Sequence, residues 1–556
     1  MCGIFAYISK NPQTQIDNYD GTYSNFKLLK NRGPDDSQFL IIKNVGLGFH
    51  RLRINDLSNA GNQPMEYNGY YLICNGEIFN HEELINKFNF KMSSTSDCEV
   101  ILHLYNFLIN DNSELDKSTI IDKLCNLLNG EFSFILFDSK LDITFVARDP
   151  YGVRPLFINK SNNKTNKYLS NESFYFASEI KGMNNIVDSI KQFPPGSFMI
   201  IYNKIKMNGI NINSNKFITI TKKYHNIILN KNINEDLLSY NLNKIFREAV
   251  YKRMMSDQEI CSLLSGGLDS SLVASIVSEK LGPNKLKTFA IGLKGSPDLK
   301  FAQIVADHIK SVHHSIELTE KEFLGSIEEV IVAIESYDTT TVRASVGNYL
   351  VSKYIKENTD CKVIFNGDYA DEVCGGYKYF KKAPSEEDFH NECIRLVDNI
   401  HYFDCLRSDR SISNNGLEAR VPFADKDFVN YYLSIDTKLR MSNDKIEKYM
   451  LRSAFENDNL LPNKVLWRCK EAFSDGVTSE TRSWHKIIQE YVDTQISDEY
   501  FEENKDKYTH NTPVLKESFY YREIFEKHYG GFSNVIPYFW MPKWCEETND
   551  PSAREI

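Results

Sequence analysis

Residues 263–271 read LLSGGLDSS, and this stretch decides the fold of the second half of the chain. An apolar run over 260–264 precedes the two glycines, and a helix-like pattern over 270–280 follows them. This order predicts a strand, a tight turn and a helix N-terminus. Glycines let backbone N–H groups approach an anion closely, and a helix N-terminus adds partial positive charge. The stretch therefore predicts a phosphate-binding loop, with an ordinary serine-capped strand–helix turn as the alternative.

Strand-like and helix-like segments alternate through the second half. Apolar runs lie at 260–264, 288–293, 312–317 and 363–365, and amphipathic segments lie at 270–280, 299–309 and 320–334. This alternation predicts a mostly parallel sheet with helices on both faces, in which ligands bind at the carboxyl ends of the strands. We expect an α/β domain with added helices over 236–530 and an irregular tail over 531–556.

The first two hundred residues follow a different pattern. Short strand-like runs, the first at Gly3–Ser9 and the last at Ser197–Tyr202, surround a helix-period segment over Asp97–Leu108. Many strands with helices between them predict an α+β layered domain. We place this domain at residues 2–205 and expect a polar linker over 206–235.

Composition excludes several classes of protein. The formal net charge of −10 argues against a nucleic-acid or membrane-surface partner. The apolar segments are short and interrupted, so we predict no membrane span, and the N-terminus lacks the regions of a signal peptide. The 11 cysteines include no Cys-x-x-Cys, so structural zinc and a disulfide framework are both disfavoured. We expect a cytoplasmic protein with small-molecule substrates and a homodimer as one possible assembly.

Cys2 follows the initiator methionine and is a candidate nucleophile. Removal of Met1 would leave a cysteine whose own α-amine, with a pKa of about 8, could act as the base that activates the thiol. A thiolate is a strong nucleophile for acyl transfer. The alternative is that a small residue simply starts a strand, and the motifs that accompany Cys2 decide between the two.

Seven motifs of the first half are similar to those of one enzyme family. They are MCGI at 1–4, RGPD at 32–35, HRLRI at 50–54, NGEIFN at 75–80, SDCE at 96–99, GEF at 130–132 and ARDPYGVRPL at 147–156. Together they resemble the glutaminase domain of class II glutamine amidotransferases. The resemblance implies a four-layer α+β N-terminal-nucleophile hydrolase fold. It also implies that Cys2 attacks the side-chain amide of glutamine, forms a thioester and releases ammonia.

The same resemblance implies a set of glutamine-binding residues. They are Arg51, Leu52, Arg53, Ile54, Asn55, Asn75, Gly76, Glu77 and Asp97. Arg51 would hold the substrate α-carboxylate, which a guanidinium fork suits geometrically. Glu77 and Asp97 would face the α-amine. Asn75 and Gly76 would form the oxyanion hole, with a hairpin turn as the structural alternative.

Further motifs extend the resemblance to the second half. They are SGGLDS at 265–270, KTFAIGL at 287–293, TTVRAS at 340–345, GLEARVPF at 416–423, IEK at 446–448 and WR at 467–468. With the first half, they resemble the glutamine-hydrolysing asparagine synthetases over nearly the full length. The resemblance implies a carbon–nitrogen ligase that adenylates the side-chain carboxylate of aspartate with ATP. Ammonia from the glutaminase site would then convert β-aspartyl-AMP to asparagine.

This resemblance also implies the residues of the second site. Those implied for ATP are Leu264, Ser265, Gly266, Gly267, Asp269, Ser270, Ile291, Asn366, Gly367 and Lys448. Mg²⁺ would be held by Asp269 and Asp371. Aspartate would be recognised by Thr340, Thr341 and Arg343.

Residues 366–372 depart from the family pattern. The family usually has Ser-Gly-Glu-Gly-Ser-Asp-Glu, and this chain has NGDYADE. Asp368 replaces a glutamate tied to the acyl-adenylate and is our candidate catalytic carboxylate. Tyr369 replaces a glycine and would be strained if the backbone there has a positive φ. Two alternatives follow: an amidotransferase or β-lactam-forming relative that acts on another carboxylate, or a glutaminase or scaffold with an impaired synthetase.

Overall fold

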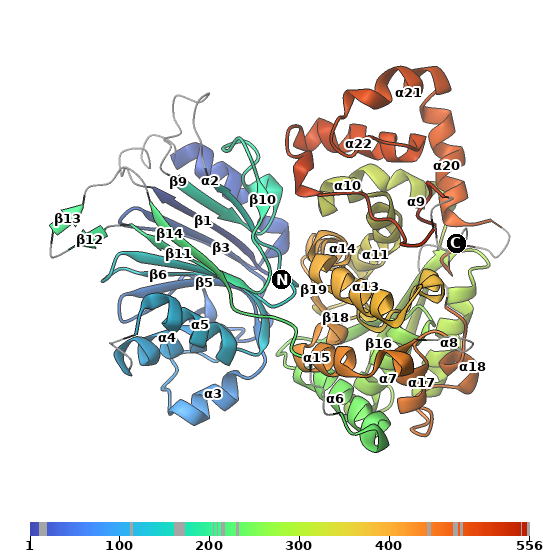
Figure 1. Cartoon of the computed structure of the whole chain (residues 1–556), viewed down its shortest axis with the longest axis horizontal. Coiled ribbons are helices and arrows are strands. Elements are labelled where there is room, and N and C mark those ends of the chain that lie inside the picture. The colour runs from blue at the N-terminus through green and yellow to red at the C-terminus, as the bar shows by residue number, and fades with distance from the viewer. Residues whose placement is uncertain are drawn as a thin grey trace. The chain divides into compact units, whose positions relative to one another are not determined.

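The structure is a computed structural model in which the chain forms two compact units, Met1–Asn226 and Ile227–Ile556 (Figure 1). It describes residues 1–9, 19–111, 115–160, 173–203, 205–207, 210–212, 217–229, 233–441, 446–470, 476–478, 482–545 and 548–552. Within these ranges, no helix has both the length and the apolar character that a membrane span requires.

The first unit contains two six-stranded sheets. Their strand orders are β10-β8-β9-β1-β3-β2 and β14-β11-β7-β6-β5-β4. The strands are β1 (Gly3–Ser9), β2 (Asp36–Ile42), β3 (Val45–Arg51), β4 (Met65–Tyr67), β5 (Tyr70–Ile78), β6 (Gly130–Asp138), β7 (Ile143–Arg148), β8 (Phe157–Lys160), β9 (Ser173–Ala177), β10 (Lys191–Gln192), β11 (Ser197–Tyr202) and β14 (Ile218–Lys223). A separate hairpin pairs β12 (Ile205–Met207) with β13 (Ile210–Ile212).

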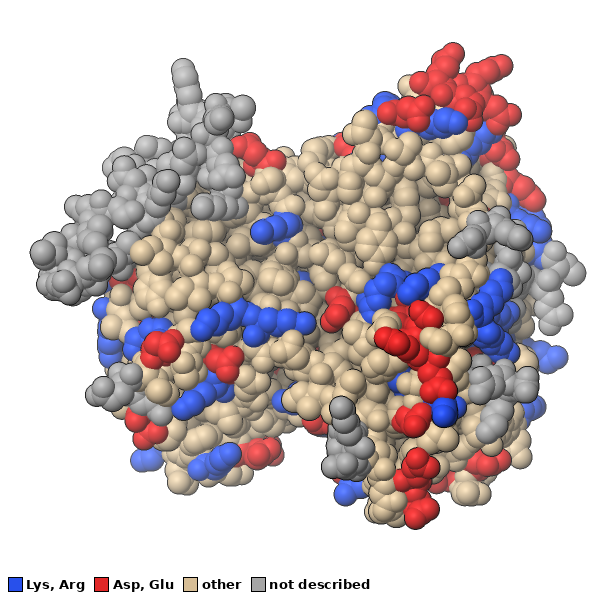
Figure 2. All heavy atoms as spheres, viewed as in Figure 1, with Lys and Arg blue, Asp and Glu red and all other residues tan. Residues whose placement is uncertain are grey.

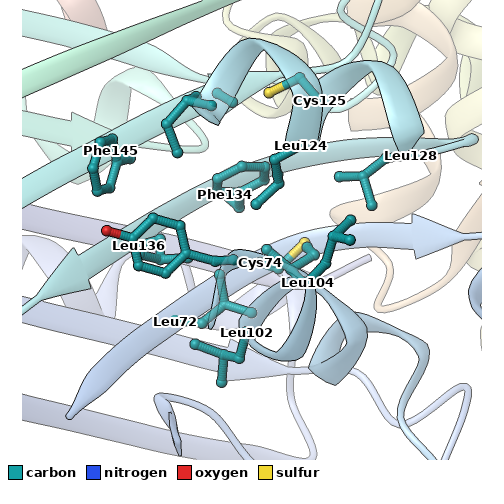
Figure 3. Packing of buried hydrophobic residues seen from close by; sticks show 14 of the residues in the cluster. Leu72, Cys74, Leu102, Leu104, Leu124, Cys125, Leu128, Phe134, Leu136 and Phe145 are labelled. Carbon is teal, nitrogen blue, oxygen red and sulfur yellow. The ribbon is translucent and has the colours of Figure 1, made fainter. Parts of the chain in front are cut away.

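Apolar side chains join the two sheets and their helices into four layers. Between the sheets, Ile4 and Leu47 from one meet Ile135 and Val146 from the other. Helices α4 (Val100–Asp111) and α5 (Lys117–Leu127) cover the outer face of the second sheet, as the cluster in Figure 3 shows. Helix α2 (Tyr19–Lys27) packs on the first sheet through Phe26, whose ring lies 6.3 Å from that of Phe5. The predicted four-layer α+β fold is confirmed.

The first unit continues past residue 205, into the predicted linker over 206–235. Strand β14 pairs with β11 along its whole length, so the unit extends to Asn226. Most side chains of β14 are exposed because it lies at the edge of the sheet, and its alternating Ile and Thr residues give only a weak apolar signal. Residues 204, 208–209, 213–216 and 230–232 lie outside the described ranges.

The second unit is built on a five-stranded parallel sheet, which confirms the predicted α/β fold. The order is β17-β16-β15-β18-β19, with β15 (Ile260–Leu263), β16 (Lys287–Leu293), β17 (Val312–Leu318), β18 (Val363–Phe365) and β19 (Glu418–Arg420). Four of these strands correspond to the predicted apolar runs. The fifth, β19, was not predicted because it has only three residues, two of them charged.

Helices make up most of the remaining second unit. They are α6 (Leu238–Lys252), α7 (Leu268–Leu281), α8 (Pro297–Ile309), α9 (Glu320–Gly325), α10 (Ile327–Ile334), α11 (Thr339–Asn358), α12 (Ala370–Cys374), α13 (Glu386–Asn399), α14 (Asp404–Ser413), α15 (Lys426–Ser434), α16 (Thr437–Arg440), α17 (Tyr449–Ala454), α18 (Asn463–Leu466), α20 (Trp484–Gln495), α21 (Asp498–Asn504) and α22 (Lys516–Tyr529).

The segment predicted as an irregular tail packs onto helix α11. Asp338, the residue that caps α11, accepts a hydrogen bond from the backbone N–H of Trp540 at 2.8 Å. Arg343 forms ion pairs with Glu517 at 2.6 Å and with Asp550 at 2.8 Å. The first turns of α11 are therefore held by residues that come about two hundred positions later, at a separation of 207 for Arg343 and Asp550.

Charged residues of both signs are mixed on the face seen in Figure 2. A group of acidic side chains lies over α21, whose first turn carries Asp498 and Glu499. Elsewhere on this face, blue and red side chains lie in small neighbouring groups. This pattern suits a surface that is screened by water and salt rather than one that attracts a polyanion.

Candidate active sites

Strand β1 places Cys2 beside the motif at 50–54. Gly3 pairs with His50 across β1 and β3, and the Cys2 thiol accepts a hydrogen bond from the backbone N–H of Leu52 at 3.4 Å. The carbonyl of Cys2 accepts from Arg32 Nε at 2.9 Å, and Arg32 also pairs with Glu179. The thiol is half-buried. It is thus held by backbone and side-chain contacts and is still accessible to a substrate.

Met1, the residue that precedes Cys2, is fully buried. Its sulfur lies 2.6 Å from Nη1 of Arg154, and Arg154 pairs with Glu131 at 3.1 Å. While Met1 is attached, the nitrogen of Cys2 belongs to a peptide bond and has no basic lone pair. The predicted use of the α-amine as a base therefore requires excision of Met1.

Four of the predicted glutamine-binding side chains come together around Asn55. Its amide donates to Glu77 and, at 3.3 Å, to Asp97, while Asp97 also accepts from the backbone N–H of Ile78 at 2.6 Å. Arg51 is buried and donates to the carbonyl oxygens of this loop, and burial lowers the pKa of its guanidinium. Three separated motifs thus bring Arg51, Asn55, Glu77 and Asp97 together, and their role in glutamine binding stays a prediction.

The remaining residues of this set have different surroundings. Arg53 is half-buried and donates to the side chain of Asn59 at 2.9 Å. Leu52 and Ile54 are buried apolar residues. Arg53 also approaches Asp36 at 3.8 Å, and the roles of Leu52, Arg53 and Ile54 in glutamine binding stay predictions.

Asn75 carries a buried amide without a hydrogen-bond partner. Its side chain is 0% exposed, and neither Nδ2 nor Oδ1 bonds to any residue that the structure describes. Leaving such a group unpaired costs about 1–3 kcal/mol, so a ligand is the expected partner. At Gly76, a Cβ atom would lie 2.2 Å from the carbonyl oxygen of Glu131, so only glycine fits between β5 and β6. This geometry supports the predicted oxyanion hole, which stays a prediction.

The LLSGGLDSS stretch forms the predicted strand, turn and helix. Strand β15 ends at Leu263 and α7 begins at Leu268. In the turn, the Ser270 hydroxyl accepts from the backbone N–H of Ser265 at 3.1 Å. Gly266 has φ +72°, and a Cβ atom there would lie 2.5 Å from the nitrogen of Ala302. The turn therefore requires glycine, and it leaves the N-terminus of α7 open toward a pocket.

That pocket has a volume of about 190 Å³ and lies within the second unit. Of the predicted residues, it is lined by Leu264, Ser265, Gly267, Asp269, Ser270, Ile291, Thr340, Asn366, Gly367, Asp368, Asp371 and Lys448. Gly266 contributes its carbonyl to Arg468 at 3.1 Å. Residues that the sequence did not predict also line it: Asp298, Asn348, Asp404, Arg407, Glu447, Arg468 and Lys470. Of these, Glu447 and Arg468 stood in the quoted motifs IEK and WR.

An ionic cluster around the buried Lys448 lies beside the phosphate loop. The ammonium of Lys448 lies 2.6 Å from both Asp269 and Asp371, and Lys470 lies 2.5 Å from Asp371. Burial opposes the positive charge of Lys448, but Asp269 and Asp371 raise its pKa above the usual value. Burial also opposes the charge of Asp371, and the two lysines overcome this and hold its pKa well below the usual range. These ion pairs therefore favour the charged forms of Lys448 and Asp371.

Two of the three predicted aspartate-binding residues do not line the pocket. The Thr341 hydroxyl donates to Asp338 at 2.8 Å, and Arg343 is paired with Glu517 and Asp550. A helical residue is turned by about 100° from its neighbour, so Thr340 can face the pocket while Thr341 faces the cap. The geometry does not support the predicted roles of Thr341 and Arg343 and assigns both side chains to holding α11 in place.

The altered segment keeps its carboxylate in the pocket. Asp368 pairs with Arg407 at 2.8 Å and accepts from the amide of Asn366 at 2.8 Å. Tyr369 has φ +78°, so the condition under which a tyrosine is strained at this position is met. Its ring is buried, and its hydroxyl lies 2.5 Å from the sulfur of Cys405. Packing of the tyrosine ring thus offsets the strain of its backbone.

We expect Tyr369→Gly to lower the thermal stability of the chain. Relief of the left-handed backbone gains about 1–2 kcal/mol, but the cavity left by a buried ring costs about 3–5 kcal/mol. The net loss of about 2 kcal/mol would appear as a lower Tm in thermal unfolding. Tyr369→Phe is the matched control, because it keeps the ring and removes only the hydroxyl at Cys405. An unchanged or higher Tm for Tyr369→Gly would show that strain dominates.

Comparisons with known proteins agree on both halves of the chain. Residues 1–205 match the family model of the glutamine amidotransferase domain, and residues 241–388 and 381–547 match that of asparagine synthase. Curated proteins called asparagine synthetase [glutamine-hydrolyzing] are similar over 100% of this chain and 98% of their own length. The protein from Gallus gallus is 41% identical over 579 residues, that from Rattus norvegicus 41% over 581 and that from Homo sapiens 40% over 581.

Proposed function

This chain belongs to the asparagine synthase family, and from that membership we propose that it converts L-aspartate to L-asparagine with ATP and glutamine. The observation that carries the proposal is the pocket of the second unit. It joins a phosphate-binding turn, the ion pairs of Lys448 and Lys470 with two aspartates, and the carboxylate Asp368 in one cavity. These groups match an adenylating enzyme, which must bind ATP and manage the charge of its phosphates.

In the first unit, Cys2 attacks the side-chain amide of glutamine. The α-amine of Cys2, once Met1 is removed, takes the thiol proton and later delivers it to the leaving ammonia. Asn75 Nδ2 and the backbone N–H of Gly76 donate to the oxygen of the tetrahedral intermediate. Arg51, Glu77 and Asp97 hold the two charged ends of the substrate. Water then hydrolyses the thioester to glutamate.

In the second unit, the loop at 265–270 holds the β- and γ-phosphates of ATP through backbone N–H groups and hydroxyls. Lys448 and Lys470 neutralise charge that builds on the phosphates when the aspartate carboxylate attacks the α-phosphorus. Asp368, held by its ion pair with Arg407, accepts a proton from the ammonia that attacks the acyl-adenylate. Pyrophosphate and then AMP leave.

The pocket also fits a magnesium ion that arrives with ATP. Mg²⁺ in nucleotide sites is held by one or two carboxylates, and substrate phosphates and waters complete its six ligands. Asp269 and Asp371 supply two such carboxylates, and the described residues contain no group of three or more potential ligands that would hold a metal alone. When bound, the ion would shield the negative charge of the triphosphate. A homodimer and a cytoplasmic location stay predictions from the sequence.

The experiment that tests the proposal is pyrophosphate release from ATP in the purified protein. We expect release that depends on aspartate and on glutamine or ammonia, together with one asparagine for each pyrophosphate. Release with another carboxylate but not with aspartate would favour a different acceptor. Glutamine hydrolysis without any ATP-linked product would show that the chain is a glutaminase or scaffold, and the proposal would be wrong.

A further inference from the structure

Helix α11 presents a row of residues to the pocket at helical spacing. Thr340, Ala344, Asn348 and Val351 all line the cavity, and residues three or four apart share one face of a helix. Ala344 and Val351 supply apolar surface, and Thr340 is the one residue of the predicted aspartate set that lines the pocket. Asn348 is the member of this row that the proposed reaction leaves without a role.

The Nδ2 atom of Asn348 is buried and has no hydrogen-bond partner among the residues that the structure describes. The residue is 5% exposed, and its Nδ2 bonds to no residue that the structure describes. Its backbone carbonyl accepts from the Ser352 hydroxyl at 2.7 Å, so the unpaired group belongs to the side chain alone. Buried donors in proteins are almost always paired. A buried, unpaired donor on the wall of a cavity therefore points to an acceptor on the ligand.

The direction of α11 shows which part of a ligand Asn348 meets. The helix lies between β17 and β18 in the chain, which are parallel strands of one sheet, so it runs against them and begins at their carboxyl edge. The phosphate loop is at this edge. Asn348 comes two turns after Thr340, about 12 Å further from the edge. The pocket there is lined by apolar residues such as Leu263, Phe289 and Val351. An uncharged, flat base suits that surface, and a phosphate does not.

We propose that Asn348 recognises the adenine base of ATP. This inference rests on the proposed function and adds the residue that selects the nucleotide. An asparagine amide can pair with adenine twice, by donating from Nδ2 to a ring nitrogen and by accepting at Oδ1 from the 6-amino group. Guanine carries a carbonyl oxygen at position 6, which would face Oδ1 without a proton between them. The site therefore prefers ATP to GTP.

The test is the affinity of Asn348→Leu, which keeps the volume of the side chain and removes both hydrogen bonds. We expect the Kd for ATP to rise about tenfold, whereas the Kd for GTP changes by less than about twofold. The KM for ATP rises in parallel, and kcat and the KM for aspartate stay unchanged. Asn358→Leu is the matched control, since that amide is exposed at the end of the same helix and bonds to the carbonyl of Tyr354. Wild-type ATP affinity in Asn348→Leu would overturn the inference.

A measurement on the unaltered chain covers the case in which Asn348→Leu does not fold. Purine riboside triphosphate lacks only the 6-amino group of ATP, and we expect it to bind about fivefold more weakly. Equal binding would overturn the inference. These measurements need binding and no turnover. A chain that binds ATP selectively but releases no aspartate-dependent pyrophosphate would contradict the proposed function and leave the inference about Asn348 standing.

Discussion

Replacing Cys2 with serine abolishes glutamine-dependent asparagine synthesis and spares synthesis from ammonia. A serine hydroxyl holds its proton far more tightly than a thiol, so at neutral pH it offers a much weaker nucleophile than the thiolate of Cys2. We expect glutaminase activity to fall at least about a thousandfold. Activity with ammonia should stay within about twofold of the unaltered protein, because the pocket of the second unit has its own residues.

The measurement is asparagine formed per minute with either nitrogen source. Cys545→Ser is the matched control, since this half-buried cysteine belongs to the second unit and lies outside the pocket lining. Intact mass adds an independent check. A chain that retains Met1 should hydrolyse no glutamine even with Cys2 in place. Substantial glutamine-dependent synthesis by Cys2→Ser, or by a chain that retains Met1, would contradict the assigned chemistry.

Replacing Lys448 with methionine should nearly stop pyrophosphate release. Lys448 is the cation between Asp269 and Asp371, and it is 2% exposed. Its loss leaves two partly buried carboxylates close together, with side chains 15% exposed, and this costs up to about 3 kcal/mol of stability. It also removes one positive charge from the phosphates, for which we expect a fall in kcat of at least about a hundredfold. Glutamine hydrolysis should continue at its normal rate.

Two further variants separate charge from folding. Lys244→Met is the matched control, because this exposed lysine only approaches Glu248 at 4.0 Å on the helix surface. In the double variant Asp269→Asn with Lys448→Met, one negative charge is removed with the positive one, so stability should partly return while pyrophosphate release does not. Full synthesis by Lys448→Met would show that this lysine only balances the aspartates. Urea unfolding and pyrophosphate release, measured on the same samples, distinguish these results.

Contiguous motifs made much of this site predictable from the sequence. The turn at 265–270 draws its glycines and hydroxyls from neighbouring residues, so its geometry follows from local order alone. The same holds for Asn75 and Gly76 on β5. In contrast, Arg407 reaches Asp368 from α14, and no local pattern marks a helix residue that will pair with a distant carboxylate. Such contacts depend on tertiary packing.

The direction in which each side chain of a helix points was also not predictable from the short motifs. The string TTVRAS suggested that Thr340, Thr341 and Arg343 act together, but a helix turns successive side chains in different directions. Thr340 lines the pocket, whereas Arg343 meets carboxylates from α22 and from Asp550. Strand β14 lies in the segment predicted as a linker. It was not predicted because it is an edge strand, and its mostly exposed side chains give only a weak apolar signal.

The ion pair between Arg343 and Asp550 also has a consequence for synthesis on the ribosome. The two residues are 207 positions apart, and translation adds about 5–20 residues per second. Arg343 therefore waits about 10–40 seconds for one of its two carboxylate partners. During that time the guanidinium of Arg343 lacks its ion pair with Asp550, so it is buried without one of the two carboxylates that stabilise it. Helix α11, which forms one wall of the nucleotide pocket, thus gains its last ion pair only after nearly the whole chain has been synthesised.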